Sequence, residues 1–407
     1  MLTRRRLMTA GAGMALAGIG FDPRLALAAI ADLPAALPEG VRKNATLEAL
    51  PGKKPLIKLS YRPPNYETPL KYFRTAITPN DAFFVRYHLS NIPEIDARTW
   101  KVTIGGEGAN GTAQFTLDDL KRMPAVEVVA VNQCAGNRRG LFEPHVPGVE
   151  WGYGAMGCAR WRGVRLKELL DKVGLKKEAI EIVLNGADSA VTDKTPDFVK
   201  SVPTWKAIED TTLVAYEMNG EPLPHFNGFP ARVIVPGWTG TYWMKHITSI
   251  TAATKSESGF WMNPAYRIPL GKFPLIGRFT SQDSAVNTPI TEMVVNSLIT
   301  SPTNDAKVKL GAPLTIGGIA WDAGYGISSV EVSTDGGKTL AAATLGEDLG
   351  RYAFRTFSLE FVPRAKGPQT IMARASNTIG QGQTRQLIAN PAGYHHNVIH
   401  RITLEVA

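Results

Sequence analysis

The sequence predicts an α+β chain in which a mixed domain of helices and strands is followed by an immunoglobulin-like β-sandwich. Toward the C-terminus, apolar runs rich in β-branched residues recur about every ten residues, which is typical of a sandwich. The preceding part combines strand-like runs with an amphipathic helix. A chain of 407 residues is long for one core, which favours two domains. We therefore expect an export signal (1–28), an extended arm (29–80), the mixed domain (81–275) and the sandwich (276–407).

The first 28 residues have the features of an export signal. Arginines at positions 4–6 precede a mildly apolar run rich in glycine and alanine, and small residues permit cleavage after residue 28 or at residue 31. The paired arginines indicate the twin-arginine export machinery, which carries proteins that are already folded. The alternative is an ordinary secretory signal with an arginine-rich start. Either route predicts a periplasmic protein.

The chain is moderately basic. Its formal net charge is +9, and +6 without residues 1–28, with lysines spread along the chain. This distribution favours an anionic substrate or an acidic protein partner. After the signal there is neither a nucleic-acid-binding motif nor an uncharged apolar run of membrane-spanning length. We therefore expect no binding to nucleic acid and no stable insertion into a membrane.

Local patterns predict the elements that follow. Residues 29–80 are rich in proline and lysine and predict little regular structure. The aromatic and β-branched run 83–89 predicts a strand that places Arg86 and His88 on one face. The glycine-rich stretch 105–111 contains a match to the dinucleotide-binding pattern. The next helix is capped only later, by Thr116 with Asp119, so we expect a hairpin loop there instead.

Cys134 is one of only two cysteines and lies where a buried strand, predicted over 125–131, gives way to a loop. The loop contains two glycines together with Arg138 and Arg139. A thiolate in this position can be a nucleophile, a metal ligand or a packed thiol, and these residues alone leave the alternatives open. Cys158 could form a disulfide with Cys134, although their spacing does not require one. The chain has no C-x-x-C-H motif, so we expect no haem in this chain.

A second unusual feature is a cation inside an apolar strand. Arg232 interrupts the run 231–235, and Lys245 follows the glycine turn 236–240. A buried cation needs either an anionic ligand or an internal salt bridge, and both alternatives remain open at this point. Between Cys134 and Arg232, the pattern predicts a helix over 164–174 and a turn at Asn219-Gly220. The sandwich strands are predicted over 293–299, 314–321, 330–333, 352–361, 370–375 and 398–406.

Five motifs occur together and in order. They are FFVRYHL (83–89), VNQCAGNRR (131–139), WGYGAMGCARW (151–161), VAYEMNGEPLP (214–224) and VEVSTDGGKT (330–339). This set resembles the sulfite oxidase family of molybdenum enzymes, and most closely the molybdenum subunit of bacterial periplasmic sulfite dehydrogenases. The resemblance extends from about residue 80 to the C-terminus. It implies a sulfite-oxidase-type molybdopterin domain followed by a dimerisation-type sandwich.

The resemblance implies one molybdenum-molybdopterin cofactor per chain. Cys134 would be the single protein ligand of the metal, and a soft thiolate suits molybdenum. Arg232 and Lys245 would bind the phosphate of molybdopterin, and Asn227 stands where the family usually has histidine. The residues implied to bind molybdopterin are Phe84, Arg86, His88, Asp188, Asn227, Arg232, Met244 and Lys245.

The resemblance also implies a pocket for sulfite, in which arginines fix the oxyanion and Tyr266 hydrogen-bonds. At the position of a second pocket arginine in vertebrate members, this chain has Ala392. We hypothesise that His88 supplies part of the missing positive charge, so that activity falls as pH rises through its titration. The implied catalytic residues are Tyr266, Arg139, Arg86, His88 and Trp151.

The function implied is that of a sulfite dehydrogenase whose electrons leave one at a time to a c-type cytochrome, a subunit or a transient partner. The alternatives are a nitrate or sulfoxide reductase of the same family and an exported binding protein without enzymatic activity. We interpret Cys158 as a packed thiol and assign no role to Arg138. Other residues get ordinary structural interpretations: surface or strand histidines for His395, His396 and His400, and core or pocket wall for Trp238, Trp243 and Trp261.

Overall fold

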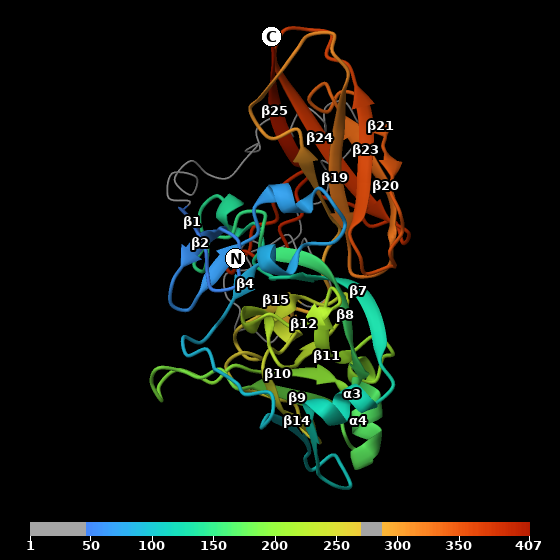
Figure 1. Ribbon diagram of the computed structural model, residues 1–407. Coiled ribbons are helices and arrows are strands. Elements are labelled where there is room, and N and C mark those ends of the chain that lie inside the picture. The colour runs from blue at the N-terminus through green and yellow to red at the C-terminus, as the bar shows by residue number, and fades with distance from the viewer. Residues whose placement is uncertain (1–45, 270–286) are drawn as a thin grey trace, which may run out of the picture.

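The computed structural model describes residues 46–269 and 287–407. The predicted export signal and the predicted boundary between residues 275 and 276 lie outside these residues. Figure 1 shows a lower domain in blue to yellow and an upper β-sandwich in orange and red. No helix within the two described ranges is long and apolar enough to span a membrane.

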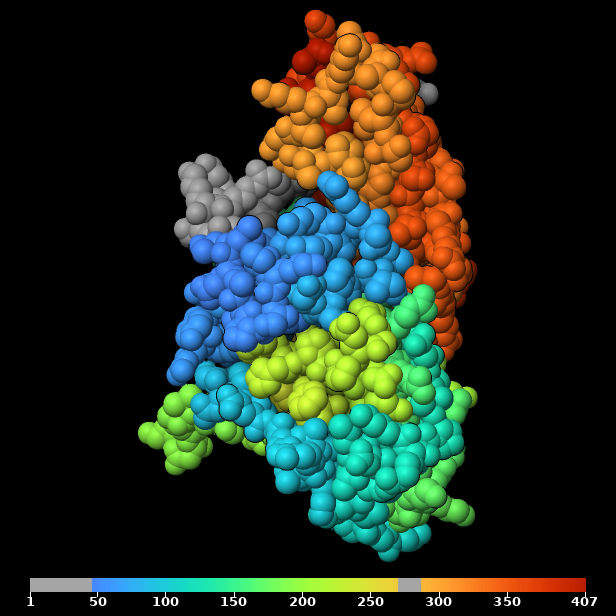
Figure 2. Space-filling model, in the orientation of Figure 1, coloured from blue at the N-terminus to red at the C-terminus, as the bar shows by residue number. Residues whose placement is uncertain are grey.

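Part of the predicted arm is a small sheet. Strands β1 (Thr46–Glu48), β2 (Leu56–Ser60) and β3 (Asn65–Glu67) pair in sequence with β4 (Val85–Arg86). The prediction of little regular structure over 29–80 is therefore wrong for these strands. The physical reason is a buried cluster that the prolines obscured, formed by Leu56, Tyr66, Val85 and Tyr87. In Figure 2 this blue segment lies against the orange sandwich above and the rest of the lower domain below.

The strand predicted over 83–89 is also largely wrong, because only β4 is a strand. Side chains take the place of a neighbouring strand along this segment. Lys53 Nζ donates to the Phe83 carbonyl at 3.2 Å, and Lys245 Nζ donates to the Arg86 carbonyl at 2.8 Å. Asn227 Nδ2 donates to the Phe84 carbonyl at 3.1 Å. These three carbonyls are thus satisfied by residues distant in sequence, and the Arg86 and His88 side chains line a cavity, with Arg86 also donating to Asn65 Oδ1 at 3.3 Å.

Two sheets form the rest of the lower domain. Their strand orders are β10-β9-β14-β5-β6 and β12-β11-β8-β7, with β13 paired to β11. The strands are β5 (Lys101–Gly105), β6 (Ala113–Thr116), β7 (Val126–Gln133), β8 (Met156–Arg165), β9 (Glu181–Gly186), β10 (Val199–Pro203), β11 (Leu213–Met218), β12 (Glu221–Pro222), β13 (Arg232–Ile234) and β14 (Ile247–Ala253). The helices are α3 (Leu117–Arg122), α4 (Leu166–Val173) and α5 (Thr204–Ala207), with 3₁₀ turns at Leu70–Phe73, Asn80–Ala82, Arg139–Leu141, His225–Asn227 and Gly240–Tyr242.

Several local predictions in this domain are confirmed. The glycine-rich stretch 105–111 is a hairpin loop between the antiparallel strands β5 and β6. Thr116 and Asp119 form a reciprocal capping box at the start of α3. Helix α4 buries its leucines and ends at Gly174, whose φ of 69° is the left-handed conformation that terminates helices. Asn219-Gly220 makes the turn between β11 and β12.

The sandwich consists of sheets with the orders β17-β19-β23-β22 and β18-β25-β24-β20-β21. Its strands are β17 (Asn296–Ser301), β18 (Ala306–Val308), β19 (Leu314–Trp321), β20 (Ile327–Ser333), β21 (Ala341–Ala342), β22 (Thr344–Leu345), β23 (Arg355–Phe361), β24 (Gly367–Asn377) and β25 (His400–Val406). Each of the six predicted runs overlaps one of these strands, because alternating burial marks them in the sequence. A short pair, β15 (Arg267–Pro269) and β16 (Asn287–Pro289), precedes them.

Arg138 joins the two domains. It adopts the left-handed conformation (φ 69°), and its guanidinium donates to Asn296 Oδ1 at 2.6 Å and to the Ser297 carbonyl at 2.7 Å. The guanidinium carbon lies 5.7 Å from the centre of the Trp321 ring. Asn296, Ser297 and Trp321 all belong to the sandwich. The residue without an assigned role in the sequence is thus a contact that fixes the cysteine loop to the second domain.

Candidate active site

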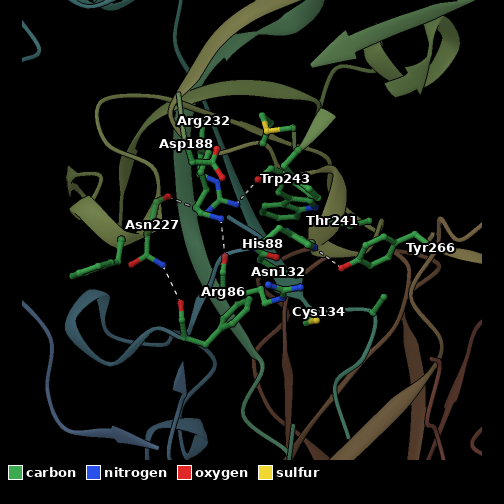
Figure 3. Close-up of a pocket in the computed structure, with 17 residues that line it drawn as sticks. Arg86, His88, Asn132, Cys134, Asp188, Asn227, Arg232, Thr241, Trp243 and Tyr266 are labelled. Carbon is green, nitrogen blue, oxygen red and sulfur yellow. Dashed lines mark hydrogen bonds between the residues drawn. The ribbon is translucent and has the colours of Figure 1, made fainter. Parts of the chain in front are cut away.

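One cavity brings together most of the residues implied by the sequence (Figure 3). Seventeen side chains line it, from the β4 segment, the cysteine loop, the turn before β14 and the segment around Tyr266. They include Cys134, Tyr266 and all eight residues implied to bind molybdopterin, namely Phe84, Arg86, His88, Asp188, Asn227, Arg232, Met244 and Lys245.

Cys134 follows the last residue of β7 at the wall of this cavity. Its amide donates to the Ala155 carbonyl at 2.9 Å, and its carbonyl accepts from the Asn137 amide, so the loop is closed around it. Both cysteines are free, and no disulfide joins them. Cys158 is fully buried away from the cavity, and burial raises the pKa of its thiol to about 12. The interpretation of Cys158 as a packed thiol is confirmed, and the two cysteines have different environments.

The end of the cavity opposite Cys134 carries the buried cation Arg232, and a second cation, the partly buried Lys245, also lines the cavity. Arg232 donates to the carbonyls of Asn227 at 3.0 Å and Trp243 at 2.7 Å. Within the described ranges, no carboxylate lies within salt-bridge distance of Arg232, so the structure does not support the internal salt bridge. Burial lowers the pKa of Arg232 to about 9 and that of Lys245 to about 7. Both shifts express the cost of a buried charge and favour binding of an anion at this end.

The polar atoms of the cavity fit a molybdopterin. In the part of the chain that the structure describes, Arg232 Nε, Asn132 Oδ1 and Thr241 Oγ1 are buried without a hydrogen-bond partner, and all three residues line the cavity. These atoms offer donors and an acceptor to a polar ring system, the cations suit a phosphate, and Cys134 supplies a soft ligand. The donor set therefore matches the group that the sequence resemblance implies.

Asn227 is held by a residue that the sequence did not single out. Its amide nitrogen donates to the Phe84 carbonyl, and its Oδ1 accepts a hydrogen bond from Lys53 Nζ. Lys53 also donates to the Asn80 carbonyl at 2.7 Å, and burial lowers its pKa to about 7. Asn227 is thus fixed by the first small sheet, so its side chain both lines the cavity and ties the arm to it.

His88 and Tyr266 form the wall beside Cys134. His88 Nε2 and the Tyr266 hydroxyl are 2.5 Å apart, and the imidazole stacks on Phe198 with ring centres 3.7 Å apart. Tyr266 has a φ of 57°, which is rare for an aromatic residue and indicates a side-chain direction imposed by its surroundings. Burial raises the pKa of its phenol, which therefore keeps its proton.

The structure does not support the hypothesis that His88 supplies positive charge. Burial, and then the nearby cations Arg86, Lys245 and Lys200, hold the pKa of His88 well below its ordinary value. An imidazole with a lowered pKa is neutral at neutral pH, and here it contacts the Tyr266 hydroxyl. The sequence could not reveal this, because the three cations come from three separate segments.

Arg139 and Trp151 do not line the cavity. Arg139 Nε donates to the Ala392 carbonyl at 2.8 Å, and its guanidinium lies 5.5 Å from the centre of the Tyr394 ring. Tyr394 in turn stacks on Tyr266 with ring centres 5.5 Å apart. Trp151 is completely buried, and its indole nitrogen has no partner among the residues described. Both residues therefore lie behind the wall formed by Tyr266 and the cysteine loop.

Other lining residues were missed or interpreted only generally. Asn132 lies in β7 two positions before Cys134, which directly follows that strand, so strand alternation could have placed both on the same face. Trp243 is pocket wall as expected, whereas Thr241 had no signal beyond its glycine turn. His400 lies in β25, as the interpretation of surface or strand histidines allowed, whereas His395 and His396 are buried outside the strands, which corrects that interpretation for these two. No group of three metal-ligating side chains occurs among the described residues.

Comparison with known proteins identifies both domains. Residues 88–261 match the oxidoreductase molybdopterin binding domain, and residues 287–407 match the Mo-co oxidoreductase dimerisation domain. The chain is 35% identical over 374 residues to mitochondrial sulfite oxidase of Macaca fascicularis. The aligned region covers 88% of this chain and 67% of that protein. It is 30% identical over 393 residues to a nitrate reductase of Hordeum vulgare, covering 90% of this chain and 44% of that one.

The fold also matches a solved structure. The sulfane dehydrogenase SoxCD from Paracoccus pantotrophus superposes with a TM-score of 0.73 at 24% identity, over 98% of this chain and 97% of that one. At this identity the match establishes the fold alone. The matched domains, the extent of the sequence identity and the geometry of the cavity agree: the chain belongs to the sulfite oxidase family of molybdenum oxidoreductases.

Proposed function

We propose that the protein is a sulfite dehydrogenase that oxidises sulfite to sulfate: SO₃²⁻ + H₂O → SO₄²⁻ + 2H⁺ + 2e⁻. The observation that carries this proposal is the composition of the cavity, which combines a thiol ligand with an excess of cationic groups. Arg86, Arg232 and Lys245 all line it, against Asp188 as the single carboxylate in the lining. A cavity of this charge favours an oxyanion over a neutral substrate.

The residues of this chain have distinct roles in the proposed reaction. Arg232 and Lys245 would hold the phosphate of molybdopterin, and Cys134 would hold the metal; when bound, this cofactor supplies oxygen-atom transfer and accepts two electrons. Arg86 binds and orients the oxyanion. Tyr266 keeps a proton on its phenolic oxygen and is directed by the neutral imidazole of His88. Phe198, which stacks on His88, keeps water from this wall.

The electrons must leave one at a time, and we assign their removal to a c-type cytochrome. The chain contains no sequence motif for haem, flavin or iron–sulfur binding, which supports an external acceptor. The paired arginines near the N-terminus support export by the twin-arginine machinery to the periplasm, where such cytochromes act. We assign one molybdenum to each chain because one Cys134 is available.

The test is sulfite-dependent reduction of cytochrome c by purified protein whose molybdenum content is measured. The wild type is expected to be active, and Cys134→Ser is expected to lose at least about 99% of the activity because it lacks the metal ligand. Cys158→Ser is the matched control, since it changes the other cysteine outside the cavity. Full activity of Cys134→Ser would refute the assignment of the site. Absence of molybdenum from the wild type would refute the proposal that the protein is a molybdenum enzyme.

Nitrate reduction is the second candidate, because the chain is 30% identical to a nitrate reductase over 90% of its length. Nitrate is also an oxyanion, and the same cations suit it. The two candidates differ in the direction of electron flow. Reduction of nitrate by the protein with a reduced viologen dye, together with no oxidation of sulfite, would favour this second function.

A further inference from the structure

Lys200 is a buried cation that the proposed reaction has not used. It lies in β10 with no exposed surface, and its Nζ donates to the Trp261 carbonyl at 2.6 Å. An ammonium group has three donors, and the carbonyl satisfies one of them. Across the two described ranges, no carboxylate lies within salt-bridge distance of Lys200. Burial lowers the pKa of Lys200 to about 7, because no counter-ion stabilises the charge of the ammonium group.

Lys206 shows how this chain buries a lysine for structural reasons. Lys206 is 4% exposed, and its Nζ contacts Glu209 at 2.6 Å and the Pro236 carbonyl at 3.2 Å. A carboxylate thus offsets the cost of burying that ammonium group. Lys200 lies six residues earlier and has no such partner. The contrast indicates that the charge of Lys200 would be stabilised by an anion that is not part of the polypeptide.

The position of Lys200 identifies the anion. Its Nζ lies 5.1 Å from the centre of the Tyr266 ring and 4.6 Å from that of Tyr242. Tyr266 lines the cavity and contacts His88, and Lys200 is one of the cations that lower the pKa of His88. The field of Lys200 therefore reaches the wall beside Cys134. Arg232, where the phosphate would bind, lies at the opposite end of the cavity (Figure 3).

Most other residues at the wall beside Cys134 supply no positive charge to the cavity. His88 is neutral, Arg139 is directed to the Ala392 carbonyl, and the side chain of Ala392 has no charge. Arg86 is the single cation of this wall that lines the cavity. Sulfite and sulfate each carry two negative charges, so the single positive charge of Arg86 balances only one of them.

We propose that Lys200 is the second cation of the substrate pocket and that, through Tyr266, it sets the affinity for doubly charged oxyanions. This inference rests on the proposed function and deepens it. Lys200 acts as a positioning residue, because Tyr266 stands between it and the cavity. Its charge holds the dianion in place before and after the reaction, so it governs binding more than the reaction step itself.

The test compares Lys200→Met, Lys200→Arg and the control Lys206→Met in molybdenum-loaded protein. Lys200→Met is expected to raise KM for sulfite about tenfold and to leave kcat within about twofold, the pattern of lost ground-state binding. Calorimetric titration with sulfate should show about the same tenfold loss, a readout that is independent of turnover. Lys200→Arg keeps the charge and should bind sulfate within about threefold of the wild type, and Lys206→Met should match the wild type.

Wild-type sulfate affinity in Lys200→Met protein of full molybdenum content would overturn the inference. If Lys200→Met fails to fold, then the sulfate affinity of Lys200→Gln decides, and an affinity equal to that of Lys200→Arg would equally overturn it. A wild type that binds sulfate through Lys200 but does not oxidise sulfite would refute the proposed function while supporting the anion site.

Discussion

Replacing Arg138 by methionine should uncouple the two domains. The guanidinium is 1% exposed and donates to Asn296 Oδ1, to the Ser297 carbonyl and, at 3.4 Å, to the Val398 carbonyl. Hydrogen bonds to a charged group contribute about 1.5–3 kcal/mol each. Burial of the guanidinium offsets part of this stabilisation, because it disfavours the charged form and lowers the pKa of Arg138 to about 10. Asn296 also keeps a bond from Gln383 at 3.3 Å. We expect a net loss of about 3 kcal/mol in the free energy of unfolding.

The assay is urea unfolding followed by tryptophan fluorescence, because Trp321 lies beside the guanidinium and reports on the junction. The control is Arg160→Met, which removes an exposed arginine paired with Glu127 at 3.4 Å and should change stability by less than about 0.5 kcal/mol. Calorimetry should resolve two transitions in the Arg138 variant where the wild type shows more closely coupled unfolding. An unfolding midpoint equal to that of the wild type would refute the assignment of Arg138 as a contact between the domains.

Three further predictions concern single groups. Burial raises the pKa of Glu67 to about 7, above its value in the unfolded chain, so the stability that its protonated form contributes is complete below about pH 4.5 and is lost as pH rises to 7. Between these pH values the free energy of unfolding of Glu67→Gln, measured in urea, should therefore change by about 3 kcal/mol less than that of the wild type. The same pH dependence in both proteins would contradict this prediction. In protein without cofactor, a thiol reagent should modify Cys134 before Cys158, because the pKa of the buried Cys158 thiol is about 12. Mass spectrometry of the labelled peptides measures the order, and modification of Cys158 first would contradict the prediction. Asn227→Ala should lower the molybdenum content of purified protein about tenfold, since it removes the one side-chain acceptor of the buried Lys53 and leaves it two backbone carbonyls. Asn80→Ala keeps its carbonyl and should not lower the content, and equal metal contents in the two variants would count against a role for Asn227.

Much of the fold could be predicted because its elements have local signatures. The sandwich strands alternate in burial, and α4 has its leucines on one side and a glycine at its end. The β4 segment could not be predicted in the same way. Its aromatic and β-branched residues suggest a strand, but its backbone is bonded by Lys53, Asn227 and Lys245, which lie in other parts of the chain. Amino-acid composition does not reveal hydrogen-bond partners that lie far apart in the sequence.

The candidate site shows the same division. Motif resemblance placed Cys134, Arg232 and Tyr266 together correctly, since all three line one cavity. It did not reveal the protonation of His88, which depends on burial and on cations from three segments. Lys200 gave no signal either, because a lysine in a strand is ordinary in a sequence and only its burial without a carboxylate is unusual.

The sandwich contributes directly to the catalytic wall. The Ala392 carbonyl holds Arg139, Tyr394 stacks on Tyr266, and the His395 amide donates to the Ala135 carbonyl beside the cysteine at 3.3 Å. A catalytic domain expressed without the sandwich would leave Arg139 and Tyr266 open to water on one side. The C-terminal segment therefore supports the wall beside Cys134, and we expect substitutions in it to change activity as well as stability.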